Sequence, residues 1–524
     1  MYVLVILSGC WFAWKLLHSS WPGWTAFPLV LIVVQITNDL GVAPLVFDLS
    51  GYEYPADSLL RRAHAGEALC AGGLILVSYL MIAGGLISVR LLSGWSGQSG
   101  TPQTGGQYCP YVAKRAWYAS LLFFALGSAV NLILICMLLR GRSLIAITFE
   151  KALMTDEALV ESPAYYILRM LAHLMVIGAL GMVFFSQGRH VRARMSIVAV
   201  LLAIGVAALY GGRQGIVTGM VSFLLLYRYG VGPISWWRVA CCLILCMFVL
   251  GGVAHLRGYN LMTAGGSGGI DTFRLLRATV VGYCRMDDAA WVLRTVPDVI
   301  PYTGVLNAAG ALGRFVPSLR IPGTDTLYMH VVERFYGGVN PSAGIGGANY
   351  STAAELYAWG GWLSLVAFGY LIGVFFGAIF EWQRRCSRNP FLVLLVVLVA
   401  VRVFFFGVHA RMPNILYEVG VYVLAVAALA AISVPSRRVV PFVLLFAWNA
   451  IPILFWKALG IEELRLVVLG SVPLLYFWGV QSLRITDRYF REGFFLDNAT
   501  TGCGSQATRA ASLTSGVMGV PNGI

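Results

Sequence analysis

Charged residues are scarce in this chain. Asp, Glu, Lys and Arg together make up 11% of the 524 residues, whereas 59% are hydrophobic and the mean hydropathy is +0.78. An average water-soluble domain carries about a quarter of its residues as charged ones. The composition therefore excludes a soluble globular enzyme, and it equally excludes a disordered or collagen-like chain.

Cysteine patterns and the common catalytic motifs are also missing. Most of the ten Cys residues lie inside apolar segments, and none forms a CxxC pair or a zinc-type Cys/His spacing. The chain has no P-loop, no GxGxxG after a strand, no HExxH and no GxSxG. It also has no selectivity filter and no matched pair of broken spans. These absences exclude a disulfide framework and argue against channels and transporters.

The positive charge follows a membrane pattern. The formal net charge is +14, and it is carried in short basic clusters between long apolar runs. In a membrane protein such clusters set the topology. We therefore expect no nucleic acid among the partners.

Apolar runs recur along most of the chain. A hydrocarbon core about 30 Å thick takes roughly 20 helical residues to cross, which predicts about 13 spans. The spans are expected near 2–17, 25–47, 68–92, 117–139, 164–185, 195–212, 215–232, 239–256, 353–381, 391–408, 414–433, 439–456 and 464–483. The prediction is an all-α, polytopic membrane helix bundle.

One long segment is too polar and too often broken by Gly and Pro to cross a bilayer. The positive-inside rule places it outside the cytoplasm, and its amphipathic pieces at 272–281 and 288–296 are expected to lie on the membrane or pack over the helices. The predicted parts are N-terminal membrane helices (1–256), a large periplasmic loop (257–350), C-terminal membrane helices (351–484) and a cytoplasmic tail expected to be mobile (485–524).

Arginines gather on the membrane side that faces this loop. Arg213 lies between glycines in Gly211–Gly215, Arg257 enters the loop, and Arg411 lies in the turn of a later hairpin. Arginine is costly in lipid, and its planar fork of donors matches phosphate oxygens. The pattern indicates a site for a phosphate or pyrophosphate. For any single arginine the alternative is that it extends to the lipid headgroups.

Carboxylates number only 23 in the whole chain. Glu355 opens the span after the loop, where it is either a functional acid or a helix cap. The pair Asp287–Asp288 either holds a cation or is solvated. Asp39, within the second span, is either a proton relay or a helix end, and His330 is a general base, a phosphate ligand or a structural residue.

Aromatic residues occur in the loop as well as at the span ends. Those at the span ends fit the usual interfacial belt. In the loop they could instead stack on sugar rings, and the sequence does not distinguish the two uses: Trp291, Tyr302, Tyr328, Tyr336 and Tyr350.

Several of these segments, in this order, resemble the signature of bacterial oligosaccharide repeat-unit polymerases. These are the O-antigen and enterobacterial common antigen polymerases of the Wzy family. The resemblance covers roughly 200–415, and the C-terminal spans and tail depart from it. The matching segments are Tyr210–Gly215, Leu256–Asn260, Arg285–Trp291, Phe315–Gly323, Ser351–Trp362 and His409–Arg411.

The resemblance implies a C-type glycosyltransferase fold in the bacterial inner membrane, with a periplasmic cleft. It implies an inverting membrane glycosyltransferase that acts on undecaprenyl-pyrophosphate-linked oligosaccharides. The growing glycan moves to the non-reducing end of a new lipid-linked unit, and the pyrophosphate lipid leaves. Besides membrane lipid, a flippase and a chain-length-regulating co-polymerase are the expected partners. Because the substrate is already activated, no cofactor and no metal are expected.

Site residues are assigned with this reaction in view. Fixed cations would stabilise the charge that builds on the leaving pyrophosphate, and this role is assigned to Arg213, Arg257, Arg320 and Arg411. Glu355 and His330 are the candidate catalytic bases for the attacking sugar hydroxyl. Secondary candidates are Arg285, Asp287, Arg314 and His409.

Two other functions remain open from the sequence. An O-antigen ligase, related in fold, would deliver the glycan to the lipid A core. A lipid-linked glycan flippase, or another transporter, would move the substrate without forming a bond.

Overall fold

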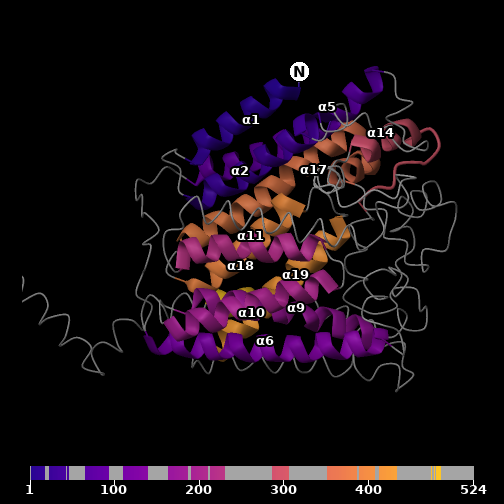
Figure 1. Cartoon of the computed structure of the whole chain (residues 1–524). Coiled ribbons are helices and arrows are strands. Elements are labelled where there is room, and N and C mark those ends of the chain that lie inside the picture. Colours follow the sequence, from indigo (N-terminus) through magenta and orange to yellow (C-terminus); the bar gives the residue numbers. More distant parts are fainter. Residues whose placement is uncertain are drawn as a thin grey trace, which may run out of the picture.

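The structure is a computed structural model of the chain (Figure 1). It describes residues 2–17, 23–42, 44–45, 65–93, 110–139, 163–186, 190–209, 213–230, 286–305, 351–385, 389–406, 412–433, 474, 477 and 479–484. Within these ranges every regular element is a helix and no strand occurs, so the predicted all-α class is confirmed for this part of the chain.

The helices follow the predicted apolar runs. In chain order they are α1 (Tyr2–Leu17), α2 (Gly23–Thr37), the π-helical η1 (Asn38–Val42), α5 (Ala65–Leu92), α6 (Pro110–Leu139), α9 (Pro163–Phe184), α10 (His190–Leu209), α11 (Arg213–Gly230), α14 (Met286–Thr295), α17 (Thr352–Arg385), α18 (Pro390–Ala400), the π-helical η4 (Val401–Phe406) and α19 (Met412–Ser433). All except α14 overlap a predicted span. The spans expected at 239–256 and 439–456, and most of that at 464–483, lie outside the described residues.

Four of these helices are long and apolar enough to cross a membrane. They contain Leu69–Leu92, Val112–Cys136, Thr352–Gln383 and Ile415–Ser433. Their outward faces stay apolar, because Leu122 is 57% and Leu363 is 80% exposed. Large exposed aliphatic side chains of this kind are unfavourable in water and expected in lipid.

Helices α5 and α17 are far apart in sequence and lie side by side in Figure 1. They run in the same direction, because Gly369 lies beside Met81, Gly373 beside Ile82 and Gly377 beside Val89. Glycines spaced four residues apart share one helix face. Without side chains there, the two backbones approach closely, and membrane helices pack by such close approach.

An ion pair joins α5 and α17 near their C-terminal ends. Arg90 Nη1 lies 3.5 Å from Glu381 Oε2, and both side chains are largely buried. We call this end of the bundle the Arg90 end. The opposite end, where α17 begins, is the Glu355 end.

A second close-packed pair consists of α6 and α9. Gly127 faces Met175 and Gly178 faces Phe124, so the two helices run in opposite directions. Trp117 Nε1 donates to Ser196 Oγ at 3.4 Å, which places the start of α10 beside the start of α6.

Helix α18 begins with a buried cap. The Asn389 side chain accepts from the backbone amides of Phe391 at 3.0 Å and Leu392 at 3.4 Å, and Pro390 occupies the first helical position. These are standard signals for a helix start. Asn389 Nδ2 also donates to the Leu483 carbonyl at 3.1 Å, which attaches the C-terminal helical residues to the start of α18.

The glycine contacts between α5 and α17 give a matched pair of variants. A Cβ at Gly85 would lie 2.6 Å from the Val374 backbone nitrogen, whereas a Cβ at the adjacent Gly84 would meet nothing within 4 Å. We expect Gly85→Ala to destabilise the protein by about 1–3 kcal/mol through overpacking, and Gly84→Ala to be neutral or slightly stabilising. Thermal unfolding in detergent measures both, and equal behaviour of the two variants would contradict the packing.

Candidate functional site

The chain connections bring the starts of α11 and α17 to one end of the bundle. α17 and α18 are joined by a short link, so α18 starts at the Arg90 end and η4 finishes at the Glu355 end. Only residues 407–411 separate η4 from α19, so α19 begins at the same end. His173 lies beside Tyr422 and Gly181 beside Leu429, so α9 runs parallel to α19. α10 then returns toward the Glu355 end, and α11 begins there with Arg213.

Glu355 lies in the first turn of α17 and its side chain is 0% exposed. The cap of this helix is Ser351, whose hydroxyl accepts from the Ala354 amide at 3.1 Å. In a capping box the acid would stand three residues after the cap, at the position of Ala354. Glu355 stands one residue further on, still in the first turn, where the helix dipole also favours a carboxylate.

Residues 286–305 pack against the same end. α14 is amphipathic and buries Trp291 and Val292 against α5 and α17; it lies beside these two helices in Figure 1. The expectation that the 288–296 piece packs over the helices is confirmed. Trp291 is only 4% exposed, so it is not available to stack on a sugar, whereas Tyr302 is 46% exposed.

The other assigned residues fall into two groups. For Arg213, the first residue of α11, and Asp287, in the first turn of α14, the structure gives backbone positions. The remaining candidates, whose roles stay predictions, lie outside the described residues: Arg257, Arg285, Arg314, Arg320, His330, His409 and Arg411.

A buried ion pair joins η4 to α19. Arg402 is 2% exposed, its Nη2 donates to Glu418 Oε1 at 2.8 Å, and its Nε contacts Glu418 Oε2. Two parallel contacts of a guanidinium with a carboxylate make a specific, charge-compensated pair. This pair was not among the residues assigned from the sequence. The sequence signal that could have indicated it is a single carboxylate in the span at 414–433, together with an arginine in the preceding span.

A buried carboxylate lies in the other π-helical segment. Asp39, in η1, is 1% exposed; Tyr79 Oη donates to its Oδ2 at 2.9 Å and Asn38 Nδ2 donates to its Oδ1 at 3.2 Å. Asp39 thus lies where α2 changes to π-helix and is bonded within the bundle. π-helical turns are rare and often occur at functional sites. Each of the two described here carries a buried charged side chain.

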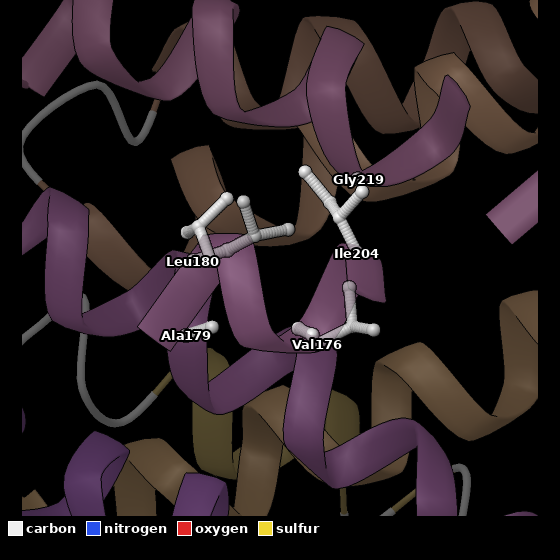
Figure 2. A pocket seen from close by; sticks show the side chains of 7 residues that line it. Val176, Ala179, Leu180, Ile204 and Gly219 are labelled. Atoms are coloured by element: carbon white, nitrogen blue, oxygen red, sulfur yellow. The ribbon is translucent and has the colours of Figure 1, made fainter. Parts of the chain in front are cut away.

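A small hollow lies between α9, α10 and α11 (Figure 2). Its lining is apolar and includes Val176, Leu180, Val200, Ile204 and Gly219. A lining of this kind gives a phosphate no hydrogen-bond donor from side chains, so the hollow is not the predicted anion site.

No metal site is evident in the described part of the chain, because no three His, Cys, Asp or Glu side chains come together there. The chain matches no protein-family model, no curated protein and no solved structure. Function must therefore be argued from the residues.

The Arg402–Glu418 pair predicts a non-additive stability pattern. Removing one partner leaves a buried charge uncompensated, which costs about 3–5 kcal/mol, whereas replacing both by apolar residues costs much less. We expect Arg402→Leu and Glu418→Leu to lower the unfolding temperature in detergent strongly, and the double variant to recover most of the loss. Exposed Arg194, replaced by Leu, is the control. Additive losses would show that the two residues are not coupled.

Proposed function

We propose that this protein polymerises polyprenyl-pyrophosphate-linked oligosaccharide repeat units at the periplasmic face of the bacterial inner membrane. The growing glycan is transferred to the non-reducing end of a new lipid-linked unit, and the donor's pyrophosphate lipid leaves. The proposal places the chain with the Wzy-type polymerases that it resembles over residues 200–415.

The observation that carries the proposal is that three assigned parts lie at the same end of the bundle, the Glu355 end. These are the buried carboxylate of Glu355, the first residue of α11, Arg213, and the segment 286–305 from the long loop, which packs on α5 and α17. Residues 407–411, which include His409 and Arg411, connect η4 to α19 in the sequence, and η4 ends and α19 begins at this end. A lipid-linked substrate would need this combination at one face of the membrane.

The arginines act on the leaving group. When the bond from sugar C1 to the phosphate oxygen breaks, the electron pair goes to the pyrophosphate, and its negative charge rises. Positioned guanidinium groups bind this charge more strongly in the transition state than in the ground state, which accelerates the step. We assign this role to Arg213 and Arg411, with Arg257 and Arg320 contributing from the loop side.

The base receives the proton of the acceptor hydroxyl. That hydroxyl attacks C1 from the face opposite the pyrophosphate, so the anomeric configuration inverts. Glu355 is the first candidate because it is a fully buried carboxylate at the start of a membrane helix. His330 is the second candidate. The proton passes to one of these two groups as the new glycosidic bond forms.

The proposed topology has about 13 spans, with residues 257–350 in the periplasm and the C-terminal tail in the cytoplasm. The Glu355 end of the bundle is then the periplasmic end. Basic residues at the Arg90 end agree with this orientation: α10 carries Arg192 and Arg194 in its first turns, and α17 ends at Arg384 and Arg385.

The experiment is polymer formation in a host that lacks its own polymerase but retains flippase and ligase. The unmodified protein should restore the ladder of glycan lengths. Arg213→Ala should lower the rate by about a hundredfold to a thousandfold, as expected for the loss of one positioned donor, and Arg213→Lys should also be impaired because Lys has no bidentate fork. Arg194→Ala, at the opposite end, should leave the ladder intact.

Other outcomes would assign other functions. A band with a single repeat unit in place of a ladder would remove the polymerase proposal in favour of a ligase. Loss of lipid-linked units from the outer leaflet after Arg213→Ala, in a flippase-competent host, would indicate transport.

Polymerisation by membranes that contain the protein should persist in the presence of EDTA. The proposed leaving-group stabilisation uses guanidinium groups, which do not depend on a divalent cation. Product length is measured by gel after EDTA treatment and after addition of Mg²⁺. Loss of polymer that returns with Mg²⁺ would overturn this part of the proposal.

A further inference from the structure

Helix α17 is broken shortly after Glu355. Gly361 has a φ of 71° and a ψ of −156°, a conformation that L-residues rarely adopt. In a continuous helix the Ala358 carbonyl would accept from the amide four residues later. Here Thr303 donates to Ala358 O from its amide at 2.9 Å and from its hydroxyl at 3.3 Å. The loop segment thus bonds to the helix at the break.

Three aromatic side chains meet at this break. Tyr302 is 46% exposed and Trp362 is 44% exposed, whereas Tyr357 is 8% exposed. The rings of Tyr357 and Trp362 lie 5.8 Å apart at 81°, and the Tyr302 hydroxyl lies beside Gly361, the residue before Trp362. The buried Tyr357 ring thus packs against the exposed Trp362 ring.

Glycine at position 361 allows this arrangement. A Cβ there would lie 3.0 Å from the Tyr302 hydroxyl oxygen. Tyr302 thus rests against bare backbone, and its ring is packed at one edge and open to solvent or lipid elsewhere. A side chain at this position would push the ring away.

A carboxylate lies on the same segment as Tyr302. Asp298 is exposed and stands four residues before Tyr302. Together the group offers two aromatic faces, phenol hydroxyls and a carboxylate. A sugar ring can place its C–H face on an aromatic ring and donate its hydroxyls to a carboxylate, and it can exchange hydrogen bonds with a phenol.

The position of the group suits a ligand at the membrane boundary. Trp362 is followed by Leu363, which is 80% exposed, on the apolar helix that continues across the membrane. The segment 297–305, which bonds to α17 at Ala358, has an irregular backbone and contributes the exposed Asp298. The boundary between apolar and polar surface is where aromatic side chains gather in membrane proteins, and it is the depth of the first sugars on a lipid carrier.

We propose that Tyr302, Trp362 and Asp298 form a saccharide subsite that holds a pyranose ring of the lipid-linked oligosaccharide. This inference rests on the proposed function, because it names a binding subsite for the same substrate. The ring packs on the faces of Tyr302 and Trp362, and its hydroxyls donate to Asp298. Trp362 lies on α17, the helix that carries Glu355, and Tyr302 and Asp298 lie in the segment that bonds to it at Ala358.

The test uses the full chain in phosphatidylcholine nanodiscs, which contain no sugar. The probe is the free oligosaccharide that mild acid releases from the lipid-linked pool of the producing strain, and binding is followed by saturation-transfer NMR titration. We expect Tyr302→Ala and Trp362→Ala each to raise the Kd by about three- to tenfold, the factor that one aromatic contact supplies. Asp298→Asn, an exposed and nearly isosteric change, should also weaken binding.

Tyr370→Ala is the matched control, since this ring is also on α17 and 38% exposed. It should leave the Kd unchanged. Equal binding by all variants, no binding by the unmodified protein, or an equal loss in Tyr370→Ala would overturn the subsite and assign the rings to a lipid-facing aromatic belt. Circular dichroism checks that each variant folds. If an alanine variant does not fold, the Kd values of Asp298→Asn and Tyr302→Phe are used in its place to test the subsite.

A parallel polymer assay separates the two proposals. Oligosaccharide binding that depends on Tyr302 and Trp362, without polymer formation by the unmodified protein, would keep the subsite and reject the polymerase. Polymer formation by the unmodified protein, combined with a Kd that is unchanged in the Tyr302 and Trp362 variants, would reject the subsite but not the polymerase.

Discussion

Exclusion of water is the constraint on which the rest of this structure depends. In a hydrocarbon layer a backbone N–H or C=O without a partner costs several kcal/mol, and only closed helical hydrogen bonding satisfies all of them within one segment. The same constraint applies to side chains. Arg402 pairs with Glu418 and Tyr79 bonds to Asp39, so both of these buried charges have a polar partner on another helix. Where α17 breaks at Gly360 and Gly361, Thr303 supplies a hydrogen bond to the carbonyl of Ala358.

Much of the helical layout could be predicted from the sequence because it depends on local composition. A run of apolar residues long enough to cross a bilayer is visible without any knowledge of neighbours, and α5, α6, α9 and α19 appear where such runs were expected. The amphipathic helix α14 could be predicted for a similar reason, because the helical spacing of its apolar residues is visible in the local sequence.

Helix pairing could not be predicted in this way. Hydropathy gives no information on which helix faces which, so the parallel contact of α5 with α17 and the pair Arg402–Glu418 appear only in the structure. The same holds for the site. The sequence singled out Glu355 and the loop aromatics, but it did not show that Trp291 is buried while Tyr302 is exposed. Burial of a loop residue depends on tertiary packing, which one sequence does not specify.

The close contact between α5 and α17 has a consequence for the biogenesis of the protein. A chain made from its N-terminus inserts α5 into the membrane well before α17 has been synthesised. During that interval the groove at Gly85 faces lipid or a temporary protein neighbour, and Arg90 lacks the partner that Glu381 later provides. Membrane helices insert individually and associate afterwards. Final closure of the bundle therefore waits for a late segment of the chain, and an incomplete chain that ends before α17 would present an open glycine groove and a solitary cation to the quality-control machinery of the cell.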